Sequence, residues 1–170
     1  MAINTKFSEK LSNICLEVYE HLGGGNFDEK DYQKALGYEL KNNKIEYLRE
    51  IHLELYYKTM PLKLGAPDFF LNKNKPQTFL EIKLGSGLDD SNRHQLKMYL
   101  QSVRYNKNEV VQKVDNGYLI NFLKVEPLLN LNPERKAKGK LLYKIELEHF
   151  KLTKGIFKKT HFIQKGPIDT

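Results

Sequence analysis

Two short segments with the composition of β-strands, 64–71 and 78–84, constrain the fold of this chain more than any other feature. Alternate residues of a β-strand share one face, so each segment is predicted to be a strand. Residues 72–76, with the sequence NKNKP, have the composition of a turn. The two strands and the turn therefore predict an antiparallel hairpin.

The hairpin is predicted to bring Asp68 next to Glu81 and Lys83. On the strand over 78–84, Glu81 and Lys83 share one face with Phe79, whereas the intervening residues are apolar and should face the core. Carboxylates bind hard divalent cations such as Mg²⁺ together with phosphate oxygens, which suits hydrolysis of a phosphodiester. A surface ion-pair cluster, with Lys83 between the two acids, is the alternative interpretation.

A third acid, Glu39, is predicted on the apolar face of a helix. Asp28 can cap this helix, which should end near Asn42, and Glu39 lies on the same side as Tyr32 and Leu36. A buried carboxylate without a partner is costly, so it needs a cation, a hydrogen-bond donor or a metal. The alternative is an edge position from which the carboxylate reaches solvent.

The remaining periodicities give the order of the elements. In chain order, the pattern predicts helices at about 5–22 and 28–42, strands at about 47–58, 62–71 and 78–84, a helix at about 89–105, and strands at about 117–124 and 141–152. Residues 126–139 are predicted to be a loop, and the chain from Thr153 has no assigned element. This order predicts an α/β sheet with helices packed on it.

The composition limits the class of protein. A chain of 170 residues fits a single domain, here 1–170 with a basic C-terminal extension from about 126. The sequence has neither an apolar run of membrane-span length nor the apolar core of a signal peptide, so a cytoplasmic location is expected. The single cysteine, Cys15, excludes an internal disulfide and a multi-cysteine metal or iron–sulfur site. Its helical, apolar context indicates a small buried side chain rather than a catalytic thiol.

Positive charge gathers towards the C-terminus. The net charge is +7, and residues 134–170 contain ten Lys or Arg against four Asp or Glu. Four of these residues, Arg135, Lys136, Lys138 and Lys140, are predicted to contact a nucleic-acid backbone, because neutralising phosphates releases counterions. A solvated lysine-rich surface is the alternative.

Five segments within residues 11–125 carry a resemblance to a known family: EVYEHLG at 17–23, YQKALGYEL at 32–40, LEIK at 80–83, QLKMYL at 95–100 and LINF at 119–122. Together with Pro67-Asp68 they resemble the PD-(D/E)xK nuclease superfamily, and most closely its GxxExxY proteins. Gly25, Glu29 and Tyr32 follow the latter motif with one additional residue. The resemblance implies a restriction-endonuclease-like core. This is a mixed β-sheet flanked by helices in the order α-β-β-β-α-β, with an extra N-terminal helix and C-terminal strand.

The resemblance also implies a metal-dependent nuclease that hydrolyses phosphodiester bonds, with DNA as the expected substrate and RNA as the alternative. It implies four ligands for Mg²⁺ or Mn²⁺, namely Asp68, Glu81, the backbone carbonyl of Ile82, and Glu39. Lys83 would orient the attacking water or stabilise the pentavalent phosphate, and Gln95 would lie near the nucleophile or a phosphate. Tyr99, on the same side of the helix as Gln95, is expected in the core.

Two further classes of function remain open at this point. A catalytically inactive nucleic-acid-binding module of the same fold would bind without cleaving. A protein-interaction domain would use the acidic cluster only structurally. Paired cuts in branched DNA would require a homodimer, which the sequence permits but does not show.

Overall fold

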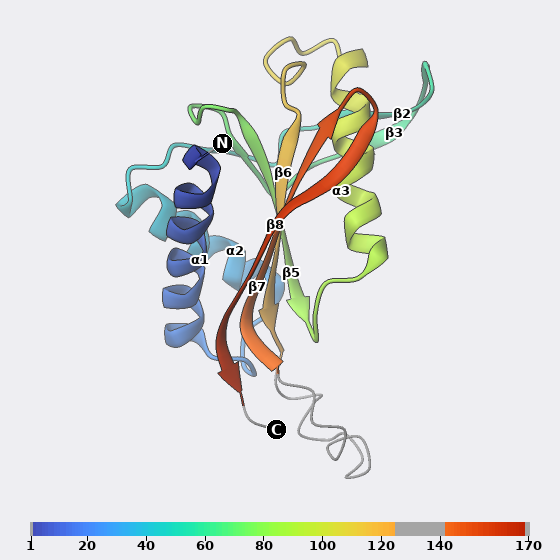
Figure 1. Ribbon diagram of the computed structural model, residues 1–170. Coiled ribbons are helices and arrows are strands. Elements are labelled where there is room, and N and C mark those ends of the chain that lie inside the picture. Colours follow the sequence, from blue (N-terminus) through green and yellow to red (C-terminus); the bar gives the residue numbers. More distant parts are fainter. Residues whose placement is uncertain (1, 125–141, 169–170) are drawn as a thin grey trace.

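The computed structural model describes residues 2–124 and 142–168, and a six-stranded mixed sheet lies at its centre (Figure 1). Helices α1 (Ala2–Leu22) and α2 (Glu29–Asn42) cover one face of the sheet, and α3 (Asp90–Ser102) covers the other. A short 3-10 helix, η1 (Val103–Tyr105), continues α3. None of the described helices is long and apolar enough to cross a membrane.

The three predicted helices are confirmed, and N-terminal capping residues mark the start of α2 and α3. Asp28 caps α2 through a capping box in which its side chain accepts from the Asp31 amide, and Asp31 accepts from the Asp28 amide. Asp89 and Asn92 form the same arrangement at the start of α3. Cys15 is fully buried on α1, as expected, and burial raises the pKa of its thiol.

The central sheet has the strand order β1-β4-β5-β6-β7-β8. Its strands are β1 (Leu48–Arg49), β4 (Phe69–Leu71), β5 (Thr78–Gly85), β6 (Asn116–Leu123), β7 (Leu142–Thr153) and β8 (Ile156–Ile168). Among the strands of the described residues, β5 and β6 pair parallel and the other neighbouring strands pair antiparallel, which makes the sheet mixed. The predicted hairpin is confirmed, since β4 pairs antiparallel with β5 and Phe69 lies opposite Leu80.

The C-terminal part of the chain belongs to the sheet. β7 confirms the last predicted strand, and the segment that follows Thr153, whose sequence predicts no element, turns back as β8. The two strands form a long hairpin beside β6 (Figure 1). The described part of the expected basic extension is therefore structural.

Two predicted strands are each divided in two. The strand expected at 47–58 becomes β1 and β2 (Leu53–Tyr57), because Glu50 adopts a φ of 51°, which an extended strand does not tolerate. The strand expected at 62–71 becomes β3 (Met60–Gly65) and β4, separated by a segment with Pro67, which has no N–H for a ladder. β2 and β3 form a separate two-stranded hairpin beside α3 (Figure 1).

Each face of the central sheet has its own apolar core. Leu80 and Ile82 pack with α1 and α2, whereas Phe79 packs with Leu96 and Tyr99 of α3. As predicted, Glu81 and Lys83 lie on the face opposite Leu80 and Ile82, but that face has an apolar core of its own, in which Glu81 is buried. Parallel strands are covered on both faces, so α3 buries this face as well.

Candidate active site

The candidate site lies in a notch where β4 ends and β5 continues. β5 pairs with β4 only at residues 78–80, so from Glu81 onward no strand of the described residues lies beside its edge on that side. The Asp68 side chain takes the place of the missing strand, because its Oδ2 accepts the Ile82 amide at 2.7 Å. The amide and carbonyl of one strand residue point the same way, so the Ile82 carbonyl also faces this notch.

Lys83 connects the acids of the notch to α3. Its Nζ donates to Oε1 of Glu81 at 3.1 Å and to Oε1 of Gln95 at 2.8 Å. The Gln95 amide donates to the Tyr99 hydroxyl at 3.0 Å, and that hydroxyl donates to the Ala66 carbonyl at 3.3 Å. The structure thus brings together Asp68, Glu81, Lys83 and Gln95, and Tyr99 is buried as expected.

Two residues that the sequence analysis did not identify hold Asp68 from the other side. Gln33 on α2 donates to Oδ1 of Asp68 at 3.1 Å and accepts from Arg49 at 3.0 Å. Arg49 also donates to the Asp68 carbonyl at 3.0 Å and stacks 4.5 Å from the centroid of the Phe69 ring. Gln33 follows Tyr32 and is buried in the structure. The available signal in the sequence was a polar residue next to the apolar positions of α2.

The two carboxylates have unusual electrostatics. Burial raises the pKa of Asp68, although the Ile82 amide and the Lys83 charge oppose this shift. Burial also raises the pKa of Glu81, and the Asp68 charge adds to that increase. Glu81 is only 3% exposed, and its Oε2 has no hydrogen-bond partner among the described residues. An unpaired buried acceptor is costly, which is typical of a site that binds a further group.

Glu39 does not join this cluster. Within the described chain, no hydrogen bond or ion pair joins its side chain to Asp68 or Glu81. Glu39 follows Gln33 by six residues, which places it about 240° further around the helix. Glu29 precedes Gln33 by one turn and so lies on the side of α2 from which Gln33 contacts Asp68. The charge of Glu29 raises the pKa of Asp68. Glu29 is therefore the acid of α2 that acts on the notch.

The notch suits a divalent cation that keeps open positions. In residues 2–124 and 142–168, no three or more His, Cys, Asp or Glu side chains form a complete metal site. Asp68, the unpaired oxygen of Glu81 and the Ile82 carbonyl provide oxygen donors, and Mg²⁺ commonly completes its shell with water and phosphate oxygens. The residues present fit such an ion.

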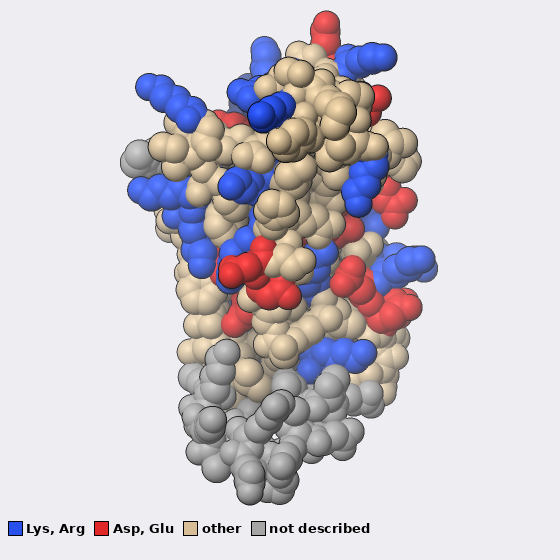
Figure 2. All heavy atoms as spheres, turned by 90° about the vertical axis from the view of Figure 1, so that its right-hand side faces the viewer, with Lys and Arg blue, Asp and Glu red and all other residues tan. Residues whose placement is uncertain are grey.

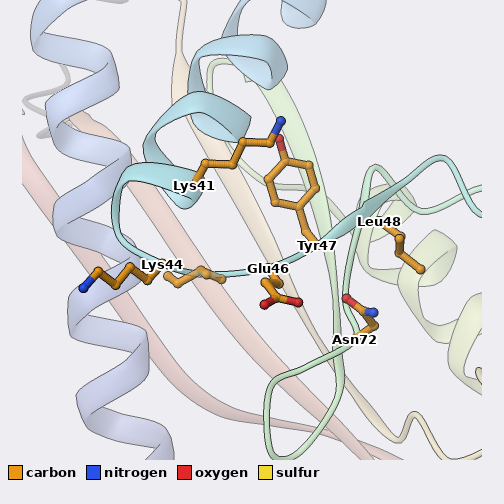
Figure 3. Close-up of a pocket in the computed structure, with 7 residues that line it drawn as sticks. Lys41, Lys44, Glu46, Tyr47, Leu48 and Asn72 are labelled. Carbon is orange, nitrogen blue, oxygen red and sulfur yellow. The ribbon is translucent and has the colours of Figure 1, made fainter.

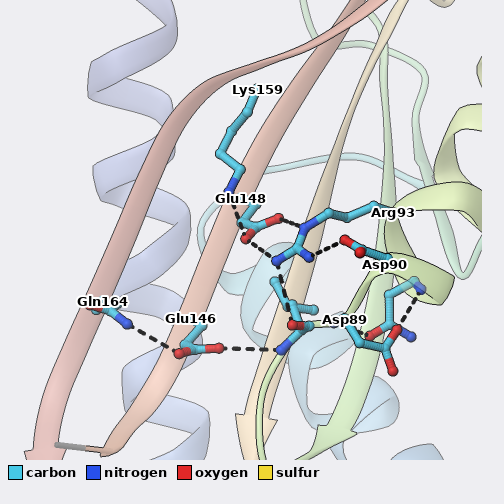
Figure 4. A network of polar contacts seen from close by, with 9 residues as sticks. Asp89, Asp90, Arg93, Glu146, Glu148, Lys159 and Gln164 are labelled. Carbon is cyan, nitrogen blue, oxygen red and sulfur yellow. Dashed lines mark hydrogen bonds and ion pairs between the residues drawn. The ribbon is translucent and has the colours of Figure 1, made fainter. Parts of the chain in front are cut away.

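A second buried acid on the same face, Glu148, provides a contrast (Figure 4). Glu148 is 2% exposed and lies on the same cross-strand row as Glu81, with Leu119 between them. Arg93 donates to both of its carboxylate oxygens at 2.8 Å, and Lys159 donates at 3.0 Å. Burial opposes ionisation of Glu148, but these hydrogen bonds outweigh it and lower its pKa. Both carboxylate oxygens of Glu148 thus accept hydrogen bonds, whereas Oε2 of Glu81 has no donor among the described residues.

A cavity at the β1 edge of the sheet is separate from the notch (Figure 3). Its volume is about 280 Å³, and Lys41, Tyr47 and Asn72 are among its lining residues. None of its lining residues belongs to the Asp68–Glu81 cluster. The predicted nucleic-acid contacts Arg135, Lys136, Lys138 and Lys140 lie outside the described residues.

Comparisons with known proteins assign the family. A family model described as the PD-(D/E)XK nuclease superfamily matches residues 5–131. The matched range includes the notch and α3, and it ends before β7. No curated protein and no solved structure gives a match. The match covers more than half of the 170 residues, so the chain belongs to the PD-(D/E)XK nuclease superfamily.

Proposed function

We propose that this protein is a nuclease that hydrolyses phosphodiester bonds of DNA and uses Mg²⁺ or Mn²⁺. The observation that carries the proposal is Glu81, a buried carboxylate with one unpaired oxygen beside Asp68 and Lys83. Membership of the superfamily supports nuclease chemistry and a nucleic-acid substrate, and nucleases of this superfamily generally use divalent metals such as Mg²⁺.

Asp68, Glu81 and the Ile82 carbonyl would hold the ion. When bound, a divalent ion polarises a phosphate oxygen and lowers the pKa of a coordinated water. Asp68 is held in position by the Ile82 amide and by Gln33, so its carboxylate needs no rearrangement. Charged groups fixed in advance are more effective than groups that must reorganise during the reaction.

Lys83 is proposed to stabilise the charge that develops on the phosphate. An ammonium group has three N–H donors, and Glu81 and Gln95 accept two of them. The third can donate to a phosphate oxygen or orient the attacking water. Gln95, which accepts from Lys83 and donates to Tyr99, is proposed as a positioning residue.

Cleavage assays with single substitutions test the proposal. Labelled DNA and RNA of matched sequence are incubated with Mg²⁺, Mn²⁺ or a chelator. Wild type should cut DNA only with metal, and Asp68→Ala, Glu81→Ala and Lys83→Ala should each lower kcat by about 10²-fold or more. Glu146→Gln, a half-buried acid on β7 outside the notch, is the matched control and should retain activity.

The outcome also separates the alternatives. If wild type cuts neither nucleic acid with either metal, the proposed activity is wrong. Metal-independent binding in the same experiment would then indicate the inactive binding module. The absence of binding at low salt would indicate a protein-interaction domain.

A further inference from the structure

A pocket at the C-terminal end of α3 brings aromatic and basic side chains together, away from the notch. Its cavity volume is about 270 Å³. We call it the tyrosine pocket. It is lined by Tyr56, Lys58, Gln101, Arg104 and Tyr105, together with two residues of the β7–β8 hairpin. Three separate parts of the fold, namely β2, the end of α3 with η1, and the β7–β8 hairpin, thus meet around it.

The aromatic rings of the tyrosine pocket present surfaces suited to stacking. The centroids of Tyr56 and Tyr105 lie 5.4 Å apart, and the ring planes make an angle of 47°. The Arg104 guanidinium lies 4.7 Å from the centroid of Tyr105, so a planar cation already rests on that ring. Both tyrosines are half-buried, and a nucleobase is planar, as the guanidinium is. Aromatic side chains stack bases of any sequence in proteins that bind single strands.

The charges around the tyrosine pocket favour a polyanion. Lys58 and Arg104 are exposed, and neither forms an ion pair within the described residues. No acid is among the described residues that line the pocket, and the nearby Glu54 carboxylate accepts from the Tyr56 hydroxyl at 2.6 Å. Figure 2, which faces the α3 side, shows several Lys and Arg side chains projecting from its upper part. Unpaired cations of this kind attract phosphates.

Partly buried hydrogen bonds hold β2 against the end of α3, and β2 connects the tyrosine pocket to the notch through β3. The Tyr56 amide donates to the Ser102 hydroxyl at 3.0 Å, and Asn106 both donates to and accepts from the backbone of Glu54. β2 pairs with β3, which leads into Asp68, and Leu53 lies opposite Gly65. Tyr56 follows Leu53 by three residues, so the tyrosine pocket lies on the order of 10 Å along β2 from the Leu53–Gly65 pair.

We propose that the tyrosine pocket binds an unpaired base of the nucleic-acid strand that enters the notch. This inference rests on the proposed nuclease function. The base would displace the Arg104 guanidinium from the Tyr105 ring and stack there beside Tyr56, and Arg104 and Lys58 would then contact the neighbouring phosphates. The enzyme would then favour substrates with a single-stranded segment beside the cleaved bond.

Binding measurements without cleavage test this inference. The affinity of wild type and variants for a labelled single-stranded oligonucleotide and for a blunt duplex is measured by fluorescence anisotropy with a chelator present. Tyr105→Leu keeps apolar bulk but removes the aromatic face, and it should weaken single-strand binding about 10-fold while duplex binding changes little. Arg104→Gln should reduce the salt slope for the single strand by about 0.7.

Two control variants match these changes. Tyr38→Leu alters a tyrosine of α2 that is 66% exposed, and Lys30→Gln removes an exposed charge of the same helix. Both should bind like wild type. Circular dichroism and thermal melting show whether Tyr105→Leu is folded. If it is not, Arg104→Gln, a change at an exposed side chain, carries the test.

The possible results separate the tyrosine pocket from the proposed activity. If wild type does not bind the single strand, or if folded Tyr105→Leu and Arg104→Gln bind it like wild type, the inference is overturned even when the enzyme cuts DNA. If binding depends on Tyr105 but no substrate is cut with either metal, the pocket stands and the nuclease proposal fails.

Discussion

At the scale of single residues, two buried glutamates on one sheet face differ in what satisfies them. Glu148 receives donors from Arg93 and Lys159, whereas one oxygen of Glu81 has no partner among the described residues. The alternation of β5 predicted the place of Glu81 and Lys83, and the hairpin predicted Asp68 beside them. Gln33 and Arg49 could not be predicted, because their roles depend on how α2 and β1 meet the end of β4.

The raised pKa of Glu81 predicts that ionisation of this residue lowers the free energy of unfolding in a pH-dependent way. A carboxyl whose pKa is higher in the folded state binds more protons there, so stability falls as pH rises through that pKa. Without metal, Glu81→Gln should therefore raise the free energy of unfolding at pH 8 by about 1 kcal/mol. The gain should disappear at acid pH, where wild-type Glu81 is protonated. Urea denaturation at several pH values measures it.

Glu148→Gln is the control for this prediction and should behave in the opposite way. The pKa of Glu148 is lowered, so its contribution to stability is present above its ordinary pKa and is lost as pH falls. The variant should be less stable than wild type at pH 8. Equal effects of the two substitutions at pH 8 would contradict this account of the notch.

At the scale of elements, the periodicity of the sequence predicted the helices, β5, β6, β7 and the β4–β5 hairpin. It did not predict the breaks near Glu50 and Pro67, because the segments on either side of each break continue the strand pattern. The second break matters for the site. It makes β4 short, and the short strand leaves the edge of β5 open at Glu81.

The Arg93 side chain is predicted to hold α3 against the β7–β8 hairpin. It joins Glu148 through two hydrogen bonds of 2.8 Å and lies two residues before Gln95. Arg93→Met should reduce the free energy of unfolding by about 2 kcal/mol, since the buried Glu148 carboxylate loses the two hydrogen bonds from Arg93. It should also lower kcat more than it changes KM, because Gln95 loses its fixed position. Denaturation and steady-state kinetics measure the two effects.

Asp90→Asn is the matched change for Arg93→Met. Asp90 also pairs with Arg93, but its side chain is fully exposed, and exposed ion pairs contribute little. This variant should resemble wild type in both stability and kcat. A loss as large as that of Arg93→Met would show that the hydrogen bonds to Glu148 are not the important ones.

At the scale of the whole molecule, the region richest in positive charge overlaps with strands of the central sheet. Ten of the 28 Lys and Arg residues lie in residues 134–170, yet 142–168 include two strands of the sheet. Deleting this region would therefore remove structure as well as charge. The sequence predicted the charge but not β8, because the run from Thr153 is rich in lysine and has no clean alternation.

Charge reversal tests the basic run without removing the strands. Changing Arg135, Lys136, Lys138 and Lys140 to Glu should weaken DNA binding and reduce the dependence of log affinity on log salt, by about 0.9 for each phosphate that is no longer neutralised. Four exposed lysines near α2 provide a control with the same number of reversed charges: Lys30, Lys34, Lys41 and Lys44. The two fourfold variants should differ in salt slope, as measured by anisotropy titrations. Equal slopes would show that only net charge matters.

The pairing of β6 with β7 sets a lower limit on the size of the folding unit. The superfamily match ends at residue 131, but all eight residues of β6 are buried, and β7 covers its outer edge. A chain cut at the end of the match would expose an apolar edge strand, which is a template for aggregation. It would also leave the Arg93 guanidinium without Glu148. The part of the chain that the family model matches is thus smaller than the part that is needed to keep the sheet covered.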